Sequence, residues 1–179
     1  MIRRWDDQLI LQGKKTHEFF QERDEFSFHI EAKGNGVDIA PIEIWRINEN
    51  AIVAISPEMR DIQPPKEKVK PVPSADDNGE WYYLPRGLYE AIIPRVVIPA
   101  DAVILALPRS TFNRLHGYHM LPTALWDSGF AARGTLSFVV QVKELRFPVG
   151  FPLFQLVAFQ AEQVPEDALY NGHWQEKKD

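Results

Sequence analysis

Short runs of β-branched and aromatic residues, separated by Pro, Gly, Asn and Asp, dominate the chain from Gly36 onward. Such runs are typical of β-strands, because these side chains suit a pleated surface and the separating residues suit turns. We therefore expect a mainly all-β fold, either a distorted β-barrel or a jelly-roll of two sheets. The expected strands are residues 37–47, 51–55, 81–84, 88–93, 102–107, 135–142 and 153–159.

Two segments depart from this pattern. Residues 5–26 mix Leu, Ile and Phe with many charges in a weak helical pattern that Gly13 interrupts, so we expect a short helix within residues 1–30. Residues 56–80 hold five prolines and a lysine-rich run, and they predict a long extended loop inside one domain that spans residues 1–179. The lysines of this loop are expected to be solvated, with contact to a phosphate as the alternative.

Composition excludes several classes of protein. A chain of 179 residues can bury a core without disulfides or a structural metal. The absence of cysteine excludes thiol nucleophiles and the cysteine-ligated zinc site of common nucleobase deaminases. The formal charge of −5 argues against a broad nucleic-acid surface, so any phosphate site must be local. No apolar run approaches the roughly 18 residues that span a bilayer, and we expect a soluble, cytoplasmic protein.

One segment carries groups that suit phosphate. Residues 108–115 read PRSTFNRL and follow an apolar strand, so that two guanidiniums and two hydroxyls stand at a strand end. Both kinds of group donate directed hydrogen bonds to tetrahedral oxygens. The same residues also fit a plain turn or helix start with surface arginines.

Two carboxylates stand in unusual surroundings. Asp127 lies among apolar and small residues before an expected strand. It can act as a general base beside a water, or it can close a turn through its side chain. Asp38 follows two glycines in the segment KGNGVDI, which is too loose for a dinucleotide or Walker loop and also fits a simple turn.

Taken in their order along the chain, these segments resemble the dCTP deaminase and dUTPase superfamily, in the form of its archaeal-type members, over about residues 33–175. Residues 35–39 resemble the first family motif, residues 108–115 the Arg-Ser-Ser-Leu-Ala-Arg-Leu motif, residues 126–130 with 133–134 the Asp-x-Gly-aromatic segment, residues 148–156 the Gly-x-x-Ile-x-Gln-Leu motif, and residues 170–175 the Tyr-x-Gly-Lys-Tyr-Gln tail. The arginine–serine and aspartate–glycine–aromatic segments carry most of the specificity.

The resemblance implies a homotrimer with active sites between subunits, which binds a small molecule, a pyrimidine deoxynucleoside triphosphate, together with Mg²⁺. Composition has already argued against nucleic acid or a membrane as the partner. It implies that Asp127 activates water, that Ser110 and Arg114 share in catalysis, and that Asp38 holds a metal-bound water. The residues it implies for substrate binding are Arg109, Ser110, Thr111, Arg114, Thr123, Ala124, Leu125, Phe130, Gln155, Trp174 and Gln175.

The two activities of the superfamily differ at one position. Members that deaminate dCTP use a Glu on the strand after the aspartate motif, where this chain has Ser137. A serine hydroxyl cannot move protons near neutral pH as a tuned carboxylate does. The sequence therefore favours a dUTP diphosphatase, with a zinc-independent dCTP deaminase or a noncatalytic nucleotide-binding trimer as alternatives.

Overall fold

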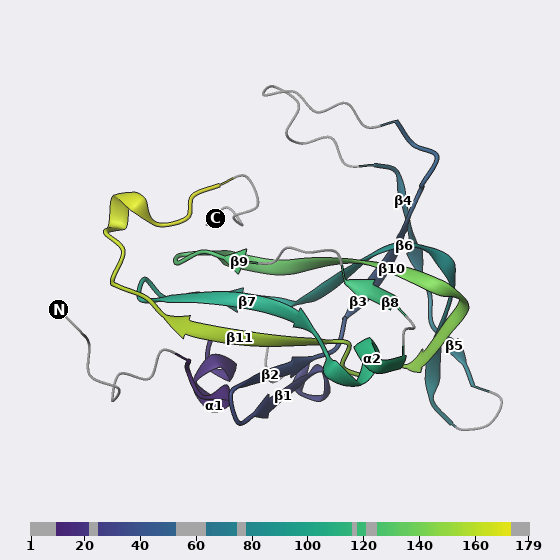
Figure 1. The fold of residues 1–179 in the computed structure, drawn as a ribbon, viewed down its shortest axis with the longest axis horizontal. Helices are drawn as coiled ribbons and strands as arrows, with labels where there is room; N and C mark the ends of the chain where they lie inside the picture. The colour runs from purple at the N-terminus through teal and green to yellow at the C-terminus, as the bar shows by residue number, and fades with distance from the viewer. Residues whose placement is uncertain are drawn as a thin grey trace.

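The computed structural model describes residues 10–21, 25–52, 64–74, 78–115, 118–120 and 125–172, which form two antiparallel sheets (Figure 1). The first sheet has the strand order β1 (Ile30–Lys33), β2 (Gly36–Ile39), β11 (Phe154–Gln160), β7 (Ala102–Pro108) and β9 (Leu125–Trp126). The second has the order β4 (Lys66–Val69), β3 (Glu43–Ile47), β6 (Glu80–Val97), β10 (Ala131–Pro148) and β8 (Tyr118–Met120), and β5 (Val72–Pro73) also pairs with β6. The helical elements are α1 (Gly13–His17), η1 (Ser27–His29), α2 (Ser110–Leu115) and η2 (Glu166–Ala168).

The expected mainly β fold is confirmed, as two sheets rather than one closed barrel among the residues that the structure describes. The two sheets share one cluster of buried side chains. Phe138 of β10 meets Phe154 of β11 with ring centroids 6.0 Å apart, and both are fully buried. Burying a side chain of this size contributes roughly 1.5–3 kcal/mol, so such pairs hold the two sheets together.

Strands β6 and β10 pair over almost their whole length and are the two long inner strands of the second sheet. The sequence predicts two strands, 81–84 and 88–93, where the structure has the single strand β6. Pro85 and Pro94 lie beside the two register shifts of the β6–β10 pair. A proline has no N–H for the ladder and is tolerated at such irregularities, so the strand continues through both.

Other boundaries also differ from expectation. The expected strand 37–47 is divided into β2 and β3, which belong to different sheets, and Pro41 lies in the connection. The expected strand 51–55 is not seen at residues 51 and 52, and its remainder lies outside the described residues. The short N-terminal helix is confirmed as α1, which Gly13 begins rather than interrupts.

The loop expected at residues 56–80 is wrong for Lys66–Val69, which form β4 at the edge of the second sheet, and for Val72–Pro73, which form β5. Residues 56–63 and 75–77 of the expected loop lie outside the described residues. Lys68 Nζ lies 2.6 Å from Glu43 Oε1, and Lys66 pairs with Glu90. Both ammonium groups also lie over the ring of Trp45. This lysine-rich edge strand pairs with β3 along its backbone and packs Val69 on the core, while its two lysines are held by carboxylates and one aromatic ring.

None of the helices in the described parts of the chain has the length and apolar character that crossing a membrane requires.

Candidate active site

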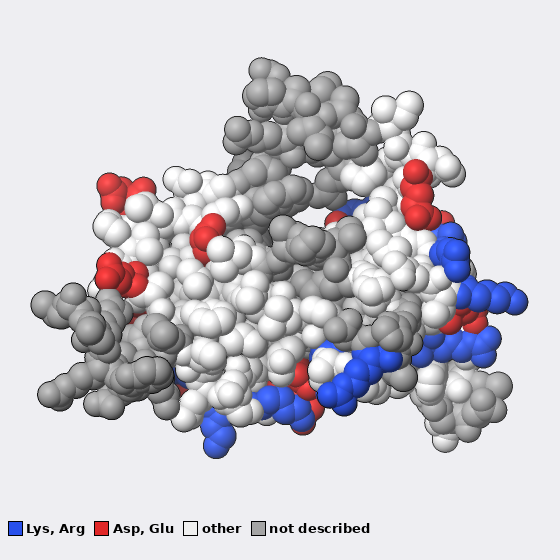
Figure 2. Space-filling view, in the orientation of Figure 1, with Lys and Arg blue, Asp and Glu red and all other residues white. Residues whose placement is uncertain are grey.

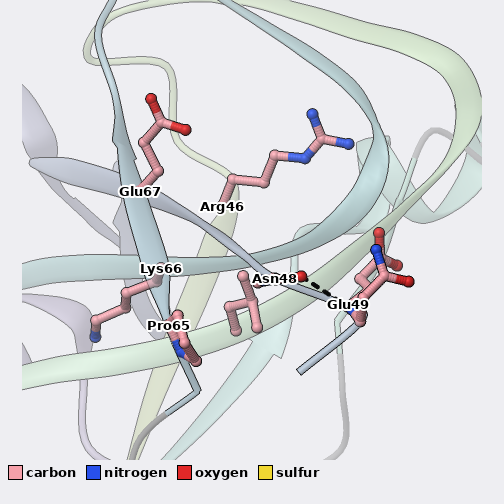
Figure 3. A pocket seen from close by; sticks show the side chains of 8 residues that line it. Arg46, Asn48, Glu49, Pro65, Lys66 and Glu67 are labelled. Carbon is pink, nitrogen blue, oxygen red and sulfur yellow. Dashed lines mark hydrogen bonds between the residues drawn. The ribbon is translucent and has the colours of Figure 1, made fainter. Parts of the chain in front are cut away.

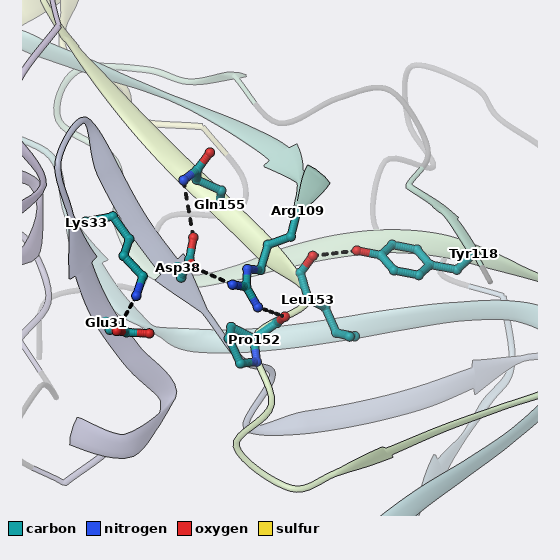
Figure 4. A network of polar contacts seen from close by, with 8 residues as sticks. All are labelled: Glu31, Lys33, Asp38, Arg109, Tyr118, Pro152, Leu153 and Gln155. Carbon is teal, nitrogen blue, oxygen red and sulfur yellow. Dashed lines mark hydrogen bonds and ion pairs between the residues drawn. The ribbon is translucent and has the colours of Figure 1, made fainter. Parts of the chain in front are cut away.

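Three of the predicted site residues meet at one end of the first sheet (Figure 4). Asp38 Oδ2 lies 2.9 Å from Arg109 Nη2, and Asp38 Oδ1 accepts a hydrogen bond of 3.2 Å from Gln155 Nε2. The Asp38 side chain is only 4% exposed. A buried carboxylate needs such partners, because transfer of an unpaired charge out of water is costly.

The strand register explains why residues so distant in the sequence meet. Gln155 lies directly opposite Asp38 in the β11–β2 pair, and Pro108 lies opposite Phe154 in the β11–β7 pair. Arg109 therefore leaves β7 beside Gln155. Its backbone N–H donates to the Leu153 carbonyl at 3.0 Å, which fixes the chain at the strand end.

The guanidinium of Arg109 is held by further contacts. Nη1 donates to the Pro152 carbonyl at 3.2 Å, and the guanidinium carbon lies 6.0 Å from the centre of the Phe151 ring. Neither Phe151 nor Pro152 belongs to the residues assigned from the sequence. The sequence signal for Phe151 was an aromatic residue shortly before Gln155, but only the fold shows that its ring lies beside Arg109.

Tyr118 ties the segment after α2 to the same corner. Its hydroxyl donates to the Leu153 carbonyl, the acceptor that also receives the Arg109 N–H. Burial raises the pKa of the Tyr118 phenol well above its ordinary value, although the hydrogen bond from the Arg109 backbone and the charge of Arg109 act in the opposite direction. The hydroxyl thus stays a neutral donor across the working range of pH.

The remaining phosphate-binding candidates of this segment lie on α2. Ser110, Thr111 and Arg114 are all exposed, so their hydroxyls and guanidinium are free to face a ligand in solution. On the face shown in Figure 2, basic side chains gather at the end near α2, with some acidic ones among them, and acidic side chains mark the end near η2. The α2 end therefore suits an anionic ligand.

Asp127 lies at the other end of this sheet. It is exposed and lines a cavity of about 460 Å³ together with Ser128, Tyr170 and Asn171. Ser128 donates to the Ala102 carbonyl at 2.7 Å, and the Tyr170 N–H donates to the Ser128 carbonyl at 2.9 Å. These bonds hold the turn after β9 against both β7 and the segment that follows η2.

Phe130, predicted to pack against a deoxyribose, is 6% exposed. Its ring stacks on Trp126, with centroids 5.7 Å apart and planes at 8°, and it also meets Tyr170 at 5.6 Å. The preceding Gly129 has φ of +87°, a conformation that L side chains rarely adopt. Tyr170 was part of a recognised motif without an assigned role, and the structure places its ring on Phe130.

The two groups of residues stand at opposite ends of β7. Trp126 pairs with Ile104, which puts Asp127 beside Val103, and Arg109 follows the last residue of β7. Arg109 follows Val103 by six positions of extended chain, a distance of about 20 Å along the strand. In Figure 1, α2 and the segment around η2 accordingly lie at opposite ends of the first sheet.

Other predicted residues are placed only in part. Leu125 is 61% exposed in β9. Thr123, Ala124, Trp174 and Gln175 lie outside the described residues. Ser137 lies opposite Glu90, whose carboxylate is paired with Lys66.

A second cavity of about 440 Å³ lies away from both groups, at the ends of β3 and β4 (Figure 3). Arg46, Asn48, Glu49, Lys66 and Glu67 line it. Arg46 and Lys66 point away from each other in Figure 3, so they do not converge on a common ligand.

The described residues hold no group of three or more His, Asp or Glu side chains arranged for a metal ion. Both oxygens of Asp38, the predicted holder of a metal-bound water, contact Arg109 and Gln155 instead. These contacts do not fit a resident magnesium ion at Asp38.

Fold and site define a two-sheet antiparallel β protein in which an arginine–carboxylate network and exposed hydroxyls occupy one end of a strand and an exposed aspartate the other. No protein-family model matches the chain. It is 30% identical over 136 residues to the probable deoxyuridine 5'-triphosphate nucleotidohydrolase of Archaeoglobus fulgidus, which covers 73% of this chain and 75% of that protein.

Proteins of the same name give similar values. That of Methanosarcina acetivorans is 29% identical over 143 residues, with 79% of this chain and 78% of the relative covered. That of Methanococcoides burtonii is 32% identical over 102 residues, with 53% and 55% covered. The chain belongs to the deoxyuridine triphosphate nucleotidohydrolase family.

Proposed function

We propose that this protein hydrolyses dUTP to dUMP and pyrophosphate. The family relationship supports the reaction, and the observation that carries it is the meeting of Asp38, Arg109 and Gln155 beside the exposed groups of α2. Fixed guanidinium and hydroxyl donors are the groups that a triphosphate needs. We propose that the substrate is the magnesium complex of dUTP, so that the ion enters with the triphosphate.

In the proposed reaction, Asp127 accepts a proton from a water molecule, and the water oxygen attacks the α-phosphorus. The bond between the α-phosphorus and the oxygen that bridges to the β-phosphorus breaks, and pyrophosphate leaves with the electron pair. Arg109 and Arg114 stabilise the charge that develops on the leaving group. Ser110 and Thr111 donate hydrogen bonds to phosphate oxygens.

The reaction needs both ends of β7 at one substrate molecule. Within one chain, the backbone of Asp127 lies beside Val103, about 20 Å along β7 from that of Arg109, a separation that favours a site built from two copies over a site within one chain. We propose that Asp127 of one copy meets Arg109 of another, in a homotrimer whose sites lie between subunits.

The first experiment measures products. Purified protein is incubated with Mg²⁺ and either dUTP or dCTP, and pyrophosphate and ammonia are quantified. We expect pyrophosphate from dUTP. Ammonia from dCTP would assign the protein to deamination, and the absence of both products would leave nucleotide binding alone.

The second experiment changes Asp127. Asp127→Asn keeps the shape of the side chain but removes the proton acceptor, so we expect kcat to fall by at least 100-fold while triphosphate binding persists. Asp101→Asn, at another exposed aspartate, is the matched control and should retain full activity. Turnover by Asp127→Asn at the wild-type rate would refute the role of Asp127 as base.

A further inference from the structure

Asp38 carries a function that differs from the one its motif suggests. Its carboxylate is almost completely buried, and each of its oxygens already has a protein partner. The partners come from two other segments, Arg109 after β7 and Gln155 in β11. Asp38 therefore lies between the residues of two motifs rather than facing a ligand in solution.

The other contacts of Arg109 hold its guanidinium in one position. Asp38 and the Pro152 carbonyl contact the guanidinium, and its carbon lies 6.0 Å from the centre of the Phe151 ring, while the Arg109 side chain as a whole remains 23% exposed. Two of its five N–H groups are used in the contacts to Asp38 and Pro152. A guanidinium fixed in this way presents its other donors in one orientation, and such preorganisation is what a phosphate in the transition state requires.

Arg109 and Arg114 differ in the charge that surrounds them, and this suggests different roles in phosphate binding. Asp38 and Arg109 form a pair with no net charge, so Arg109 contributes direction more than positive potential. Arg114 is exposed on α2, and it supplies charge at the same end of the sheet. If the orientation of Arg109 matters more than its net charge, loss of the Asp38 charge should weaken phosphate binding, although a negative charge is removed.

We propose that Asp38, assisted by Gln155, is a positioning residue that orients the Arg109 guanidinium for the triphosphate, and that it does not hold a magnesium-bound water. This inference rests on the proposed function, since it assigns the ligand of Arg109. A positioning role and a metal role predict opposite changes in the affinity for a polyphosphate when the Asp38 charge is removed, and this affinity can be measured without metal.

The test is the binding of inorganic tripolyphosphate in EDTA, measured by calorimetry. Removal of a carboxylate near an anion would by Coulomb's law tighten binding. If Asp38 positions Arg109, Asp38→Asn should instead weaken binding by about 5-fold or more, as expected for loss of a charge-assisted contact. Equal or tighter binding by Asp38→Asn would overturn the proposal.

The matched control is Glu31→Gln. Glu31 lies opposite Asp38 in the β1–β2 pair, but its carboxylate is exposed and pairs with Lys33 (Figure 4). Glu31→Gln should leave tripolyphosphate binding unchanged. Gln155→Met removes the amide that donates to Asp38 and keeps a side chain of similar length. It leaves the Asp38–Arg109 pair in place, so it should weaken binding less than Asp38→Asn, and it keeps the proposal testable if Asp38→Asn does not fold.

Activity supplies the second readout. With dUTP, Asp38→Asn should lower kcat by about 10-fold or more, while the Mg²⁺ concentration for half-maximal rate stays at the wild-type value. Rescue by excess Mg²⁺ would show that Asp38 serves the metal and would overturn the proposal. If wild-type protein does not hydrolyse dUTP, the proposed function fails by itself, and the binding measurement still decides the role of Asp38.

Discussion

At the scale of single residues, the structure shows a histidine buried among aromatic side chains just before β1. His29 is 5% exposed, and the rings of Phe26 and Phe28 lie 5.8 and 4.0 Å from its own. Its Nδ1 has no hydrogen-bond partner among the described residues. Burial lowers the pKa of His29 below its ordinary value of 6.5, against the opposing effect of backbone hydrogen bonds with Ala40 and Pro41.

This pKa shift predicts an acid-sensitive stability. Because the unfolded chain binds the His29 proton more readily than the folded chain, the free energy of unfolding should fall as pH drops through 6.5 and below. His29→Gln should reduce this fall, measured as the difference in unfolding free energy between pH 7.5 and pH 5.5. The exposed His119 gives the control His119→Gln, which should keep the wild-type difference. An unchanged slope in His29→Gln would contradict the prediction.

At the scale of elements, a glycine lets the two sheets approach each other. Gly134 lies at a register shift of β10, and a Cβ there would come within 2.6 Å of the Trp126 indole and 3.0 Å of Ile93. Trp126 belongs to the first sheet and Gly134 to the second. The contact therefore anchors β9, and the Asp127 turn that follows it, to the other sheet.

Gly134→Ala tests this anchor. The added methyl group must displace Trp126, and overpacking of this kind typically costs about 1–3 kcal/mol. We expect a loss of that size in the free energy of unfolding by urea. Gly34→Ala, where a Cβ meets nothing within 4 Å, should change stability much less. Equal losses in both variants would show that the contact is unimportant.

The same elements show what the sequence could predict. Runs of β-branched and aromatic residues predicted β7 and β11 to within one residue at each end, and the central part of β10, because such runs favour a strand whatever its partner. The strand Lys66–Val69 has no apolar alternation, so it could not be recognised before Glu43, Glu90 and Trp45 were seen beside it. Proline marks either a break or a bulge, and only the register of β6 with β10 separates the two cases.

Some residues of the candidate site could be predicted from the sequence, and others could be found only in the structure. Resemblance to known motifs selected Asp38, Arg109 and Gln155, and the structure brings all three together. Their mutual contacts depend on the register of β2, β7 and β11, which no local pattern encodes. The partners Phe151, Pro152 and Tyr118 were missed for that reason, since they act through positions set by long-range pairing.

At the scale of the whole molecule, the separation of Asp127 from Arg109 along β7 supports the proposal that the active site forms between copies of the chain. Each copy would contribute the aspartate to one site and the arginine network to another. This arrangement predicts that two inactive variants can complement each other, which a site contained in one chain cannot do.

The prediction is tested with Asp127→Asn and Arg109→Ala, each of which we expect to be inactive alone. Mixed assemblies, formed by coexpression, contain some sites with an intact Asp127 from one copy and an intact Arg109 from the other. Random mixing of two variants in a closed symmetric oligomer should restore roughly a quarter of the wild-type sites. Coexpression of two different Asp127 variants is the control and should restore nothing. No recovery in the first mixture would place the whole site within one chain.

The long pairing of β6 with β10 also governs how the chain is made. Val97 pairs with Ala131 and Trp81 with Pro148, so the partner of β6 is synthesised well after β6 itself. At about 5–20 residues per second, a ribosome needs several seconds to deliver β10. During that interval one edge of an 18-residue strand has no partner from the finished sheet. We therefore expect the nascent protein to be prone to misassembly at this edge until β10 has been made.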